Sequence, residues 1–404
     1  MFTIQPEKLP NSRETLPIKV WLPGIEWLEE GCLQQAKNLS RYPYAVKQIA
    51  LMADTHQGFG MPIGGVMATR DVVVPNAVGV DIGCGVAFCE SSVDMQDISK
   101  SLLTDLVSKI MREIPQGFNH HKSRRDVQCI KEFKRKNPEE KRHEQIWKEL
   151  DAALYQIGTL GGGNHFIEFQ QNEKGKLCLM VHSGSRNIGY KIAGYFNRIA
   201  GNNKNKWNSD VPKKHELDFI PIECDEGQSY LKWMNLARAF AQESRQMMMH
   251  TIFSIFEKQA GIRIENSILD VHHNDVNCEK NENEKLWIHR KGAIRANKDE
   301  LGIVPGAMGR KSYIVKGKGN QDSFFSCSHG AGRAMSRKQA KKQFDQKYVT
   351  GELDEKHIIL GKSKLSDVGE EAPGAYKDID FVLEQQKDLL KPVQVLEGRA
   401  VIKG

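Results

Sequence analysis

The sequence predicts a mixed α/β or α+β fold, arranged as a single large domain with insertions. Three observations support this prediction. Short apolar and β-branched runs, which are typical of strands, alternate with segments of helical periodicity. The 404 residues are 39% hydrophobic and 27% charged, a composition that can bury a substantial core. Residues 1–404 contain no internal repeat and no low-complexity linker that would divide them into separate domains.

Charge and cysteine content narrow the class of protein. The formal net charge of +7 is compatible with a polyanionic partner, although an ordinary soluble surface explains it equally well. The eight cysteines contain no CxxC pair, which argues against a disulfide framework and favours a reducing compartment. There is no run of 18 apolar residues, and Pro6, Glu7 and Pro10 interrupt any signal-peptide core. We therefore expect a cytoplasmic protein without a membrane partner.

The first half of the chain has short strands and one clear helix. Apolar or β-branched runs predict strands at 17–20, 47–52 and 71–75. Apolar residues at helical spacing predict a helix over 97–114, capped by Asp97 or Ser99. Residues 119–145 are a basic insertion, with nine Lys or Arg against four Asp or Glu between positions 121 and 142. A solvated charged surface is the favoured interpretation, and a surface for nucleic-acid phosphates is the alternative.

The second half continues the mixture of strands and helices. A strand is predicted at 177–181, and a long helix at 227–260 ends at Gly261, a residue typical of C-caps. Another strand is predicted at 311–315. We expect a helix to open directly after the glycine-rich turn 330–333, with His329 at its mouth, and a last helix over 375–390.

The residues that could carry chemistry stand in dense clusters with glycine, which lets a backbone approach a ligand closely. Because adjacent residues of a strand point to opposite faces, only one of His272 and His273 should face a given metal. The three glycines at 161–163 can present N–H groups to phosphate, but the P-loop Gly-Lys-Ser/Thr is missing. We interpret the clusters as converging on one site; they contribute Asp81, Cys84, His165, His182, His272 or His273, His289 and His329.

This inventory exceeds the four ligands of a mononuclear zinc site. A mixture of carboxylate, thiolate and imidazole suits two transition ions, with the thiolate of Cys84 as a bridge. Ligand softness alone favours zinc or iron over manganese. Neighbouring arginine, asparagine and glycine imply a phosphorylated ligand, and metal pairs commonly serve phosphoryl chemistry. The alternative is that the histidines fill separate core or loop positions.

Five motifs, in this order, resemble those of the RtcB family of RNA-splicing ligases, over the chain from about Lys47 to its end. They are Gly79–Gly85, Gly163–Glu168, His182–Arg186, His272–Asn274 and Ser328–Arg333. The resemblance implies mixed β-sheets surrounded by helices and a ligase dependent on GTP and two Mn²⁺. Such an enzyme joins RNA 3′-phosphate or 2′,3′-cyclic phosphate ends to 5′-hydroxyl ends, in RNA splicing or repair, through a GMP-histidine intermediate. It also implies RNA as a partner and leaves room for an activating protein such as archease.

The resemblance also implies roles for individual residues. Asp81, Cys84 and His165 would hold one Mn²⁺, and Cys84, His182 and His273 the other. His329 would be the nucleophile toward GTP, Arg186 would meet the RNA phosphate, and Asp54 is a candidate proton acceptor. The positions that match guanylate contacts are Asn164, Phe166, Glu168, Asn274, Pro305, Gly306, Ala307, Met308, Ser312, Gly330, Ala331, Gly332 and Lys403.

Three positions depart from the family pattern. Ala307 stands where a serine or threonine is usual, Thr55 replaces a valine, and Asp275 stands where an aromatic residue is common. They leave open a specialised paralogue with a narrower RNA substrate. The alternative function is a dinuclear-metal phosphoesterase that acts on cyclic-phosphate ends without guanylylation. It would need neither His329 nor Lys403.

Overall fold

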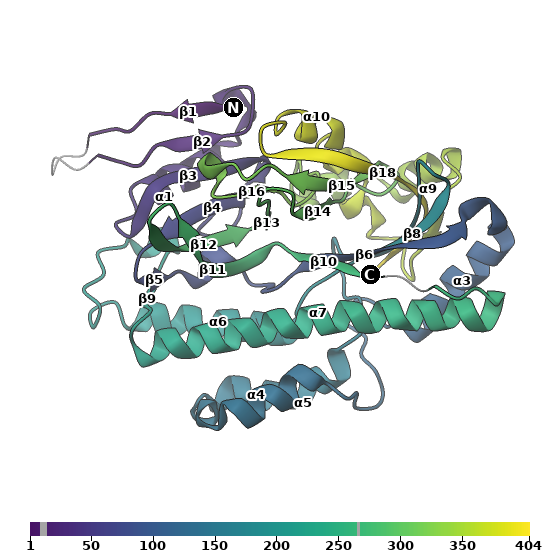
Figure 1. Ribbon diagram of the computed structural model, residues 1–404, viewed down its shortest axis with the longest axis horizontal. Coiled ribbons are helices and arrows are strands. Elements are labelled where there is room, and N and C mark those ends of the chain that lie inside the picture. Colours follow the sequence, from purple (N-terminus) through teal and green to yellow (C-terminus); the bar gives the residue numbers. More distant parts are fainter. Residues whose placement is uncertain (9–13, 265–266) are drawn as a thin grey trace.

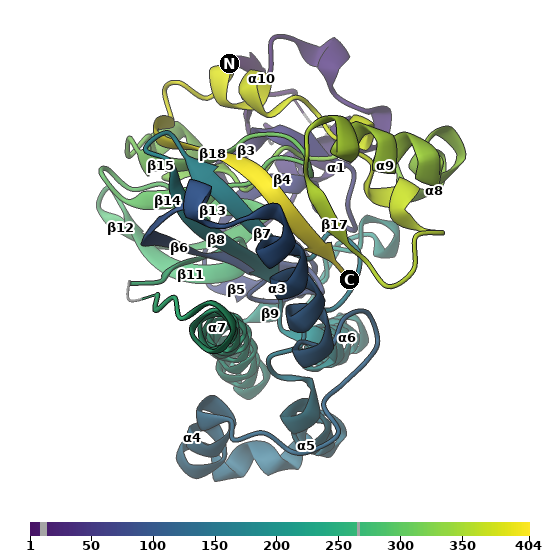
Figure 2. The same ribbon diagram turned by 90° about the vertical axis from the view of Figure 1, so that its right-hand side faces the viewer.

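The computed structural model describes residues 1–8, 14–264 and 267–404; Pro10, cited above, lies outside them. Two large sheets and two small ones form the centre, and helices cover them (Figures 1 and 2). The predicted fold class, mixed sheets surrounded by helices, is confirmed. The helices are α1 (Glu30–Ser40), α2 (Pro75–Val78), α3 (Lys100–Glu113), α4 (Gln128–Lys136), α5 (Glu144–Gln156), α6 (Arg186–Asn202), α7 (Asp225–Ala260), α8 (Arg337–Gln343), α9 (Gln346–Glu355) and α10 (Ile379–Glu384).

The six-stranded sheet holds much of the N-terminal part of the chain. Its strands pair antiparallel except β2 and β3, which are parallel. Its order is β1 (Phe2–Ile4), β2 (Ile18–Val20), β3 (Ala45–His56), β4 (Ile63–Thr69), β12 (Glu284–Lys291) and β11 (Asn274–Asn281).

The eight-stranded sheet carries most of the candidate ligands. Its order is β10 (Leu269–His272), β6 (Gly85–Asp94), β8 (Lys176–Ser183), β7 (Phe166–Asn172), β18 (Leu390–Lys403), β15 (Ser312–Gly317) and β14 (Leu301–Val304), with β17 (Ile359–Gly361) pairing parallel to β18. The two small sheets are β13 (Ala293–Arg295) with β16 (Ser326–Ser328), and β5 (Val72–Val73) with β9 (Ile220–Pro221).

Both faces of the eight-stranded sheet are buried, because alternate residues of a strand point to opposite sides. In β6, Ala87 and Cys89 pack into a cluster with residues of α3 and α7. Val86 and Phe88 pack on the opposite side with residues of α8 and α9. The predicted helices at 97–114 and 227–260 are confirmed; Ser99 caps the first, and Gly261 ends the second in the left-handed conformation.

The basic insertion folds into α4, a 3-10 turn at Pro138–Arg142 and α5, which continues to Gln156. These helices lie on the side of α6 and α7 that faces away from the sheets (Figures 1 and 2). The insertion is anchored as well as charged: Phe133 packs on Trp233 of α7 with ring centroids 4.7 Å apart. Buried Glu140 accepts hydrogen bonds from the Trp233 indole (2.9 Å) and the Ser229 hydroxyl (3.0 Å).

Two predicted helices in the C-terminal part were wrong in extent. The helix expected over 375–390 is only α10, because the chain turns after it and pairs as β18 with β15. No helix opens at the glycine-rich turn itself; α8 starts only at Arg337, after the Ser336 capping box. Arg333 instead forms a β-bridge with Tyr376, which keeps this segment extended. His329 therefore lies at the end of β16 and not at a helix mouth.

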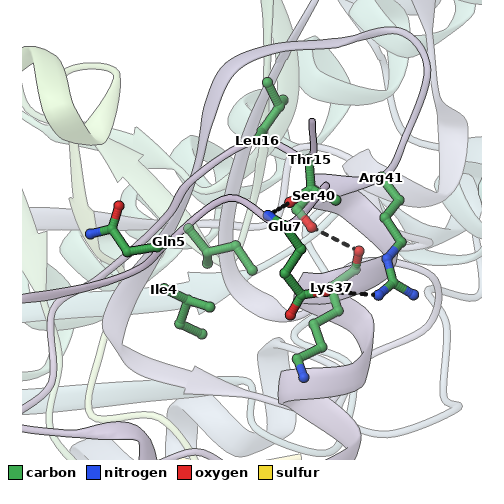
Figure 3. Close-up of a pocket in the computed structure, with 9 residues that line it drawn as sticks. Ile4, Gln5, Glu7, Thr15, Leu16, Lys37, Ser40 and Arg41 are labelled. Carbon is green, nitrogen blue, oxygen red and sulfur yellow. Dashed lines mark hydrogen bonds and ion pairs between the residues drawn. The ribbon is translucent and has the colours of Figure 1, made fainter. Parts of the chain in front are cut away.

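The surface hollow drawn in Figure 3 lies near the N-terminus and holds no Cys or His. The Glu7 carboxylate accepts a hydrogen bond from Arg41 (3.1 Å), and the Glu7 N–H donates to the Thr15 hydroxyl (2.9 Å). Its lining residues are Ile4, Gln5, Glu7, Thr15, Leu16, Ile18, Lys37, Ser40 and Arg41. Separately, none of the helices in the described residues combines the length and apolar character needed to cross a bilayer.

Candidate functional site

The register of the eight-stranded sheet gathers the predicted clusters at one edge. Gly85, directly after Cys84, pairs with Ser183 on one side and with His272 on the other. On the next strand His182 pairs with Phe166. Antiparallel pairing thus brings Cys84, His165, His182 and His273 together, although almost 190 positions separate the first from the last.

Two groups of side chains could each hold a metal ion, and they share Cys84. One group is Asp81, Cys84 and His165, and the other is Cys84, His182 and His273; within each, the donor atoms lie within 4.8 Å of one another. The Cys84 thiol lies 3.4 Å from Nε2 of both His165 and His182. Nε2 of His165 lies 3.2 Å from the Asp81 carboxylate. The same two ligand sets are the ones that the family resemblance implies.

The protonation states fit a cation site. Burial lowers the pKa of His165, His182 and His273, so their imidazoles are neutral and offer lone pairs. Burial also raises the pKa of the Cys84 thiol, which a bound cation would offset. Burial raises the pKa of Asp81, but the hydrogen bond to His165 outweighs burial, and the pKa of the Asp81 carboxyl is lowered to about 2.

Unpaired and oriented atoms support the same interpretation. Nδ1 of His273 is buried and has no hydrogen-bond partner among the described residues, as expected of an atom that awaits a ligand. Nδ1 of His165 lies 3.1 Å from the Leu160 carbonyl, and Nδ1 of His182 lies 3.3 Å from the Asn164 carbonyl. These contacts aim the opposite ring nitrogen of each histidine at Cys84. The donor set suits two divalent transition metal ions that share a thiolate.

A carboxylate–imidazole pair stands beside this cluster. Nδ1 of His329 lies 2.7 Å from the Asp54 carboxylate, which also accepts the His329 backbone N–H at 3.1 Å. The His329 ring lies against His273, with centroids 4.6 Å apart. Asp54 is fully buried; burial raises its pKa, but the His329 charge and hydrogen bond outweigh it, so the pKa is lowered. Asp54 therefore orients His329 and leaves Nε2 available.

Arg186, expected to meet phosphate, begins α6 beside the metal ligands. Its Nη1 lies 3.2 Å from Nδ1 of His165. The guanidinium packs on Gly161 so closely that a Cβ there would lie 2.0 Å from Nη2. Its Nε is buried and has no partner among the described residues. An anion at this position would meet a cationic side chain at a helix N-terminus.

The positions expected to contact guanylate fall on neighbouring segments. Lys403 of β18 pairs with Phe166 of β7, and the Lys403 ammonium lies 5.7 Å from the Phe166 ring centroid. Burial raises the pKa of Glu168 to about 8, and its Oε1 is buried with no partner among the described residues. The Ala331 N–H donates to the Pro305 carbonyl (3.1 Å), which joins the turn 305–308 to 330–332.

The remaining expected positions serve mainly to hold loops. The Ser312 hydroxyl accepts the Gly306 N–H at 3.1 Å. Both ends of the Asn274 amide are engaged inside the protein, with the Asp81 carbonyl at 3.0 Å and the Gly292 N–H at 2.8 Å. Asn274 thus connects the loop that contains Asp81 with the turn at Gly292.

Two histidines of the inventory lie apart from the cluster. His289 is fully buried in the six-stranded sheet, where Nε2 accepts the Val74 N–H (3.0 Å) and Nδ1 lies 3.1 Å from the Trp287 carbonyl. His272 points away from its neighbour His273 and lies 2.9 Å from the Asp275 carboxylate. Of the two adjacent histidines, only His273 belongs to a candidate ligand group, as the alternation of side chains along a strand leads one to expect.

Arg245 of α7 supports the site and is absent from the residues predicted from the sequence. It is fully buried and donates to the carbonyls of Gly83 (3.0 Å) and Ser183 (2.8 Å), next to Cys84 and His182. Its guanidinium also pairs with Asp270 of β10. An arginine on a helix face otherwise filled by Ala241, Met248 and Ile252 was a visible signal, since charges are rarely buried without a partner.

The fold and the site together define a candidate metalloenzyme that acts on phosphate esters. Comparison with known proteins gives the family: the profile described as tRNA-splicing ligase RtcB matches residues 35–404. Similar proteins include RNA-splicing ligase RtcB of Escherichia coli, 35% identical over 97% of this chain and 98% of its own length. The tRNA-splicing ligases RtcB of Nanoarchaeum equitans (31%, 96% and 96%) and Thermococcus kodakarensis (31%, 88% and 87%) are also similar. The chain belongs to the RtcB family of RNA-splicing ligases.

Proposed function

We propose that this protein joins an RNA 3′-phosphate or 2′,3′-cyclic phosphate end to a 5′-hydroxyl end, at the expense of GTP. The observation that carries the proposal is the Asp54–His329 pair, whose imidazole lies against His273 of a metal-ligand group. A phosphoesterase would need the ligand groups alone. A nucleophile oriented beside them supports covalent capture of GMP.

His329 acts as the nucleophile. Nε2 attacks the α-phosphorus of GTP; a P–N bond forms, the bond to the bridging oxygen breaks, and pyrophosphate leaves. Asp54 holds the Nδ1 proton and stabilises the charge that the ring gains. A 2′,3′-cyclic phosphate end is first opened by water to a 3′-phosphate and a 2′-hydroxyl. The GMP then passes from His329 to the RNA 3′-phosphate, and finally the 5′-hydroxyl attacks that phosphate, loses its proton and displaces GMP as the leaving group.

Asp81, Cys84, His165, His182 and His273 would hold two Mn²⁺ ions. Bound there, the ions would neutralise phosphate charge during transfer. Arg186 holds the RNA phosphate close to His165. Cys84 belongs to both ligand groups and would supply its thiolate to both.

The guanine end of GTP lies along β7 and β18 in this proposal. Lys403 and Phe166 offer a cation over an aromatic ring. The unpaired Oε1 of buried Glu168 can accept a guanine N–H. The turn 305–308, Ser312 and the glycine turn 330–332 approach the nucleotide through their backbone groups. Ala307 contributes no hydroxyl there.

Three further assignments belong to the proposal. Residues 1–404 act as one catalytic domain, and the insertion is carried on α6 and α7. The protein works in the cytoplasm, in keeping with its eight unpaired cysteines. An activating protein such as archease is included in the proposal as a partner, and slow guanylylation of the purified protein would be the sign that it is needed.

The test is incubation with α-labelled GTP and Mn²⁺ without RNA, followed by denaturing electrophoresis. We expect a labelled band that is acid-labile and alkali-stable, as a phosphoramidate is. His329→Ala should remove the band. His272→Ala is the matched control, since this histidine points away from the site, and should keep it. A band of normal intensity in His329→Ala would refute the proposed nucleophile.

A further inference from the structure

Phe118 is a large apolar side chain that stands wholly in water. The residue is 101% exposed, more than any other large hydrophobic residue in the described part of the chain. It lies in the loop of residues 115–127 that joins α3 to α4 (Figure 2). A single exposed apolar residue needs no explanation by itself. Three features of this loop give Phe118 a role.

The loop is held firmly by its backbone. The Gly117 N–H donates to the Gly161 carbonyl at 2.9 Å, and the Asn119 N–H donates to the Gln116 carbonyl at 3.1 Å. Further along, the His121 N–H donates to the Tyr155 carbonyl at 3.0 Å. The residues on both sides of Phe118 are thus fixed, and the exposed ring is presented from an ordered support.

The loop is attached to the active-site glycines. Gly161, which accepts the bond from Gly117, is the residue on which the Arg186 guanidinium packs. Arg186 in turn reaches to 3.2 Å from His165. Phe118 therefore directly follows Gly117, whose N–H is bonded to Gly161 under the Arg186 guanidinium. The Phe118 ring is exposed to solvent, where an RNA ligand can reach it.

The cations beside Phe118 are not neutralised by carboxylates, although the Arg124 Nε donates to the Tyr155 hydroxyl (3.3 Å) and Arg125 Nη2 lies 3.2 Å from Nδ1 of His121. In the part of the chain that the structure describes, Lys122, Arg124 and Arg125 form no ion pair with a carboxylate, and all three are exposed. In the adjoining α4, by contrast, Lys134 and Lys136 pair with Asp151 and Glu132. Lys122, Arg124 and Arg125 are therefore exposed cations of this loop that phosphates can reach.

We propose that Phe118 is a stacking platform for an unpaired nucleobase beside the RNA break, with Lys122, Arg124 and Arg125 contacting the adjacent phosphates. This inference rests on the proposed function, because it takes RNA as the ligand. Exposed aromatic rings bordered by cations bind single-stranded nucleic acid without reading its sequence. The platform makes the enzyme favour ends with an unpaired nucleotide over a nick in a fully paired duplex.

The test uses short RNAs that carry 2-aminopurine at the nucleotide next to the 3′-phosphate or next to the 5′-hydroxyl. Stacking on Phe118 quenches the fluorescence of one of the two. Phe118→Ala should abolish the quenching and raise the KM for single-stranded ends about tenfold. Phe118→Tyr keeps an aromatic ring and should retain the quenching and the KM of the wild type. Trp27→Ala is the control, since this half-exposed ring stacks on Phe381 in another part of the fold.

Unchanged quenching and KM in Phe118→Ala would overturn the inference and would leave the ring as a contact for some other macromolecule. Equal KM values for unpaired ends and for a paired nick would overturn it too. The fluorescence measurement requires only RNA binding, so it remains decisive if guanylylation fails. Guanylylation of the wild-type protein without RNA, measured alongside, tests the proposed function separately.

Discussion

Replacement of Arg245 is the sharpest test of how this site is held together. Arg245→Met removes the guanidinium that pairs with Asp270 and that donates to the carbonyls of Gly83 and Ser183. The Asp270 side chain is only 5% exposed, so the variant leaves a buried carboxylate without its partner. Loss of one partner of a buried ion pair costs about 3–5 kcal/mol in the free energy of unfolding.

A second variant separates stability from positioning. In Arg245→Met/Asp270→Leu no charge is left unpaired, so most of the lost stability should return. The two carbonyls beside Cys84 and His182 stay untethered in both variants. We therefore expect the double variant to bind Mn²⁺ about tenfold more weakly than the wild type, as for other supports of metal ligands.

Urea unfolding gives the free energies, and calorimetric titration of the metal-free protein gives the affinity. A double variant that regains both stability and wild-type Mn²⁺ affinity would refute the positioning role. A loss of less than about 1 kcal/mol in Arg245→Met would show that the pair is not sealed from water.

Three further predictions concern the ligand groups, Glu168 and the anchoring of the insertion. Because Cys84 belongs to both ligand groups and His165 to one, Cys84→Ala should lose both Mn²⁺ ions, whereas His165→Ala should keep roughly half of the metal, as measured by metal analysis; equal metal contents would contradict a shared thiolate. Burial raises the pKa of Glu168 to about 8 from its ordinary 4.5, so between these pH values the folded protein holds a proton that the unfolded chain has released. The melting temperature should therefore fall as the pH rises through this window, less steeply in Glu168→Gln, and identical profiles would argue against a protonated Glu168. Glu140→Ala removes the buried acceptor of Ser229 and Trp233 and should cost about 1–3 kcal/mol, with faster proteolysis between α4 and α5 than in the exposed control Glu139→Ala; equal cleavage rates would show that the insertion is anchored without Glu140.

Local sequence determined the chemistry of the site. Glycines within two positions of Asp81, Cys84 and His329 indicate candidate site residues from the sequence alone, and strand alternation separates His272 from His273. The sequence also predicts the long helix α7, because its apolar residues recur at helical spacing up to Gly261. Such features depend on neighbours within a few positions, so the chain carries them without reference to the fold.

Only the tertiary structure decided which of these residues meet. His289 looked like a ligand in the sequence, but the pairing of β12 with β4 places it at the Val74 N–H. The helix expected over 375–390 stops at Glu384, because the chain then turns, with the Leu389 N–H bonded to the Gln386 carbonyl, and enters β18 at Leu390. Arg245 and Asp54 acquire their roles from carbonyls and a ring far away in the sequence. The register between distant strands depends on how whole sheets pack, and no short stretch of residues contains that information.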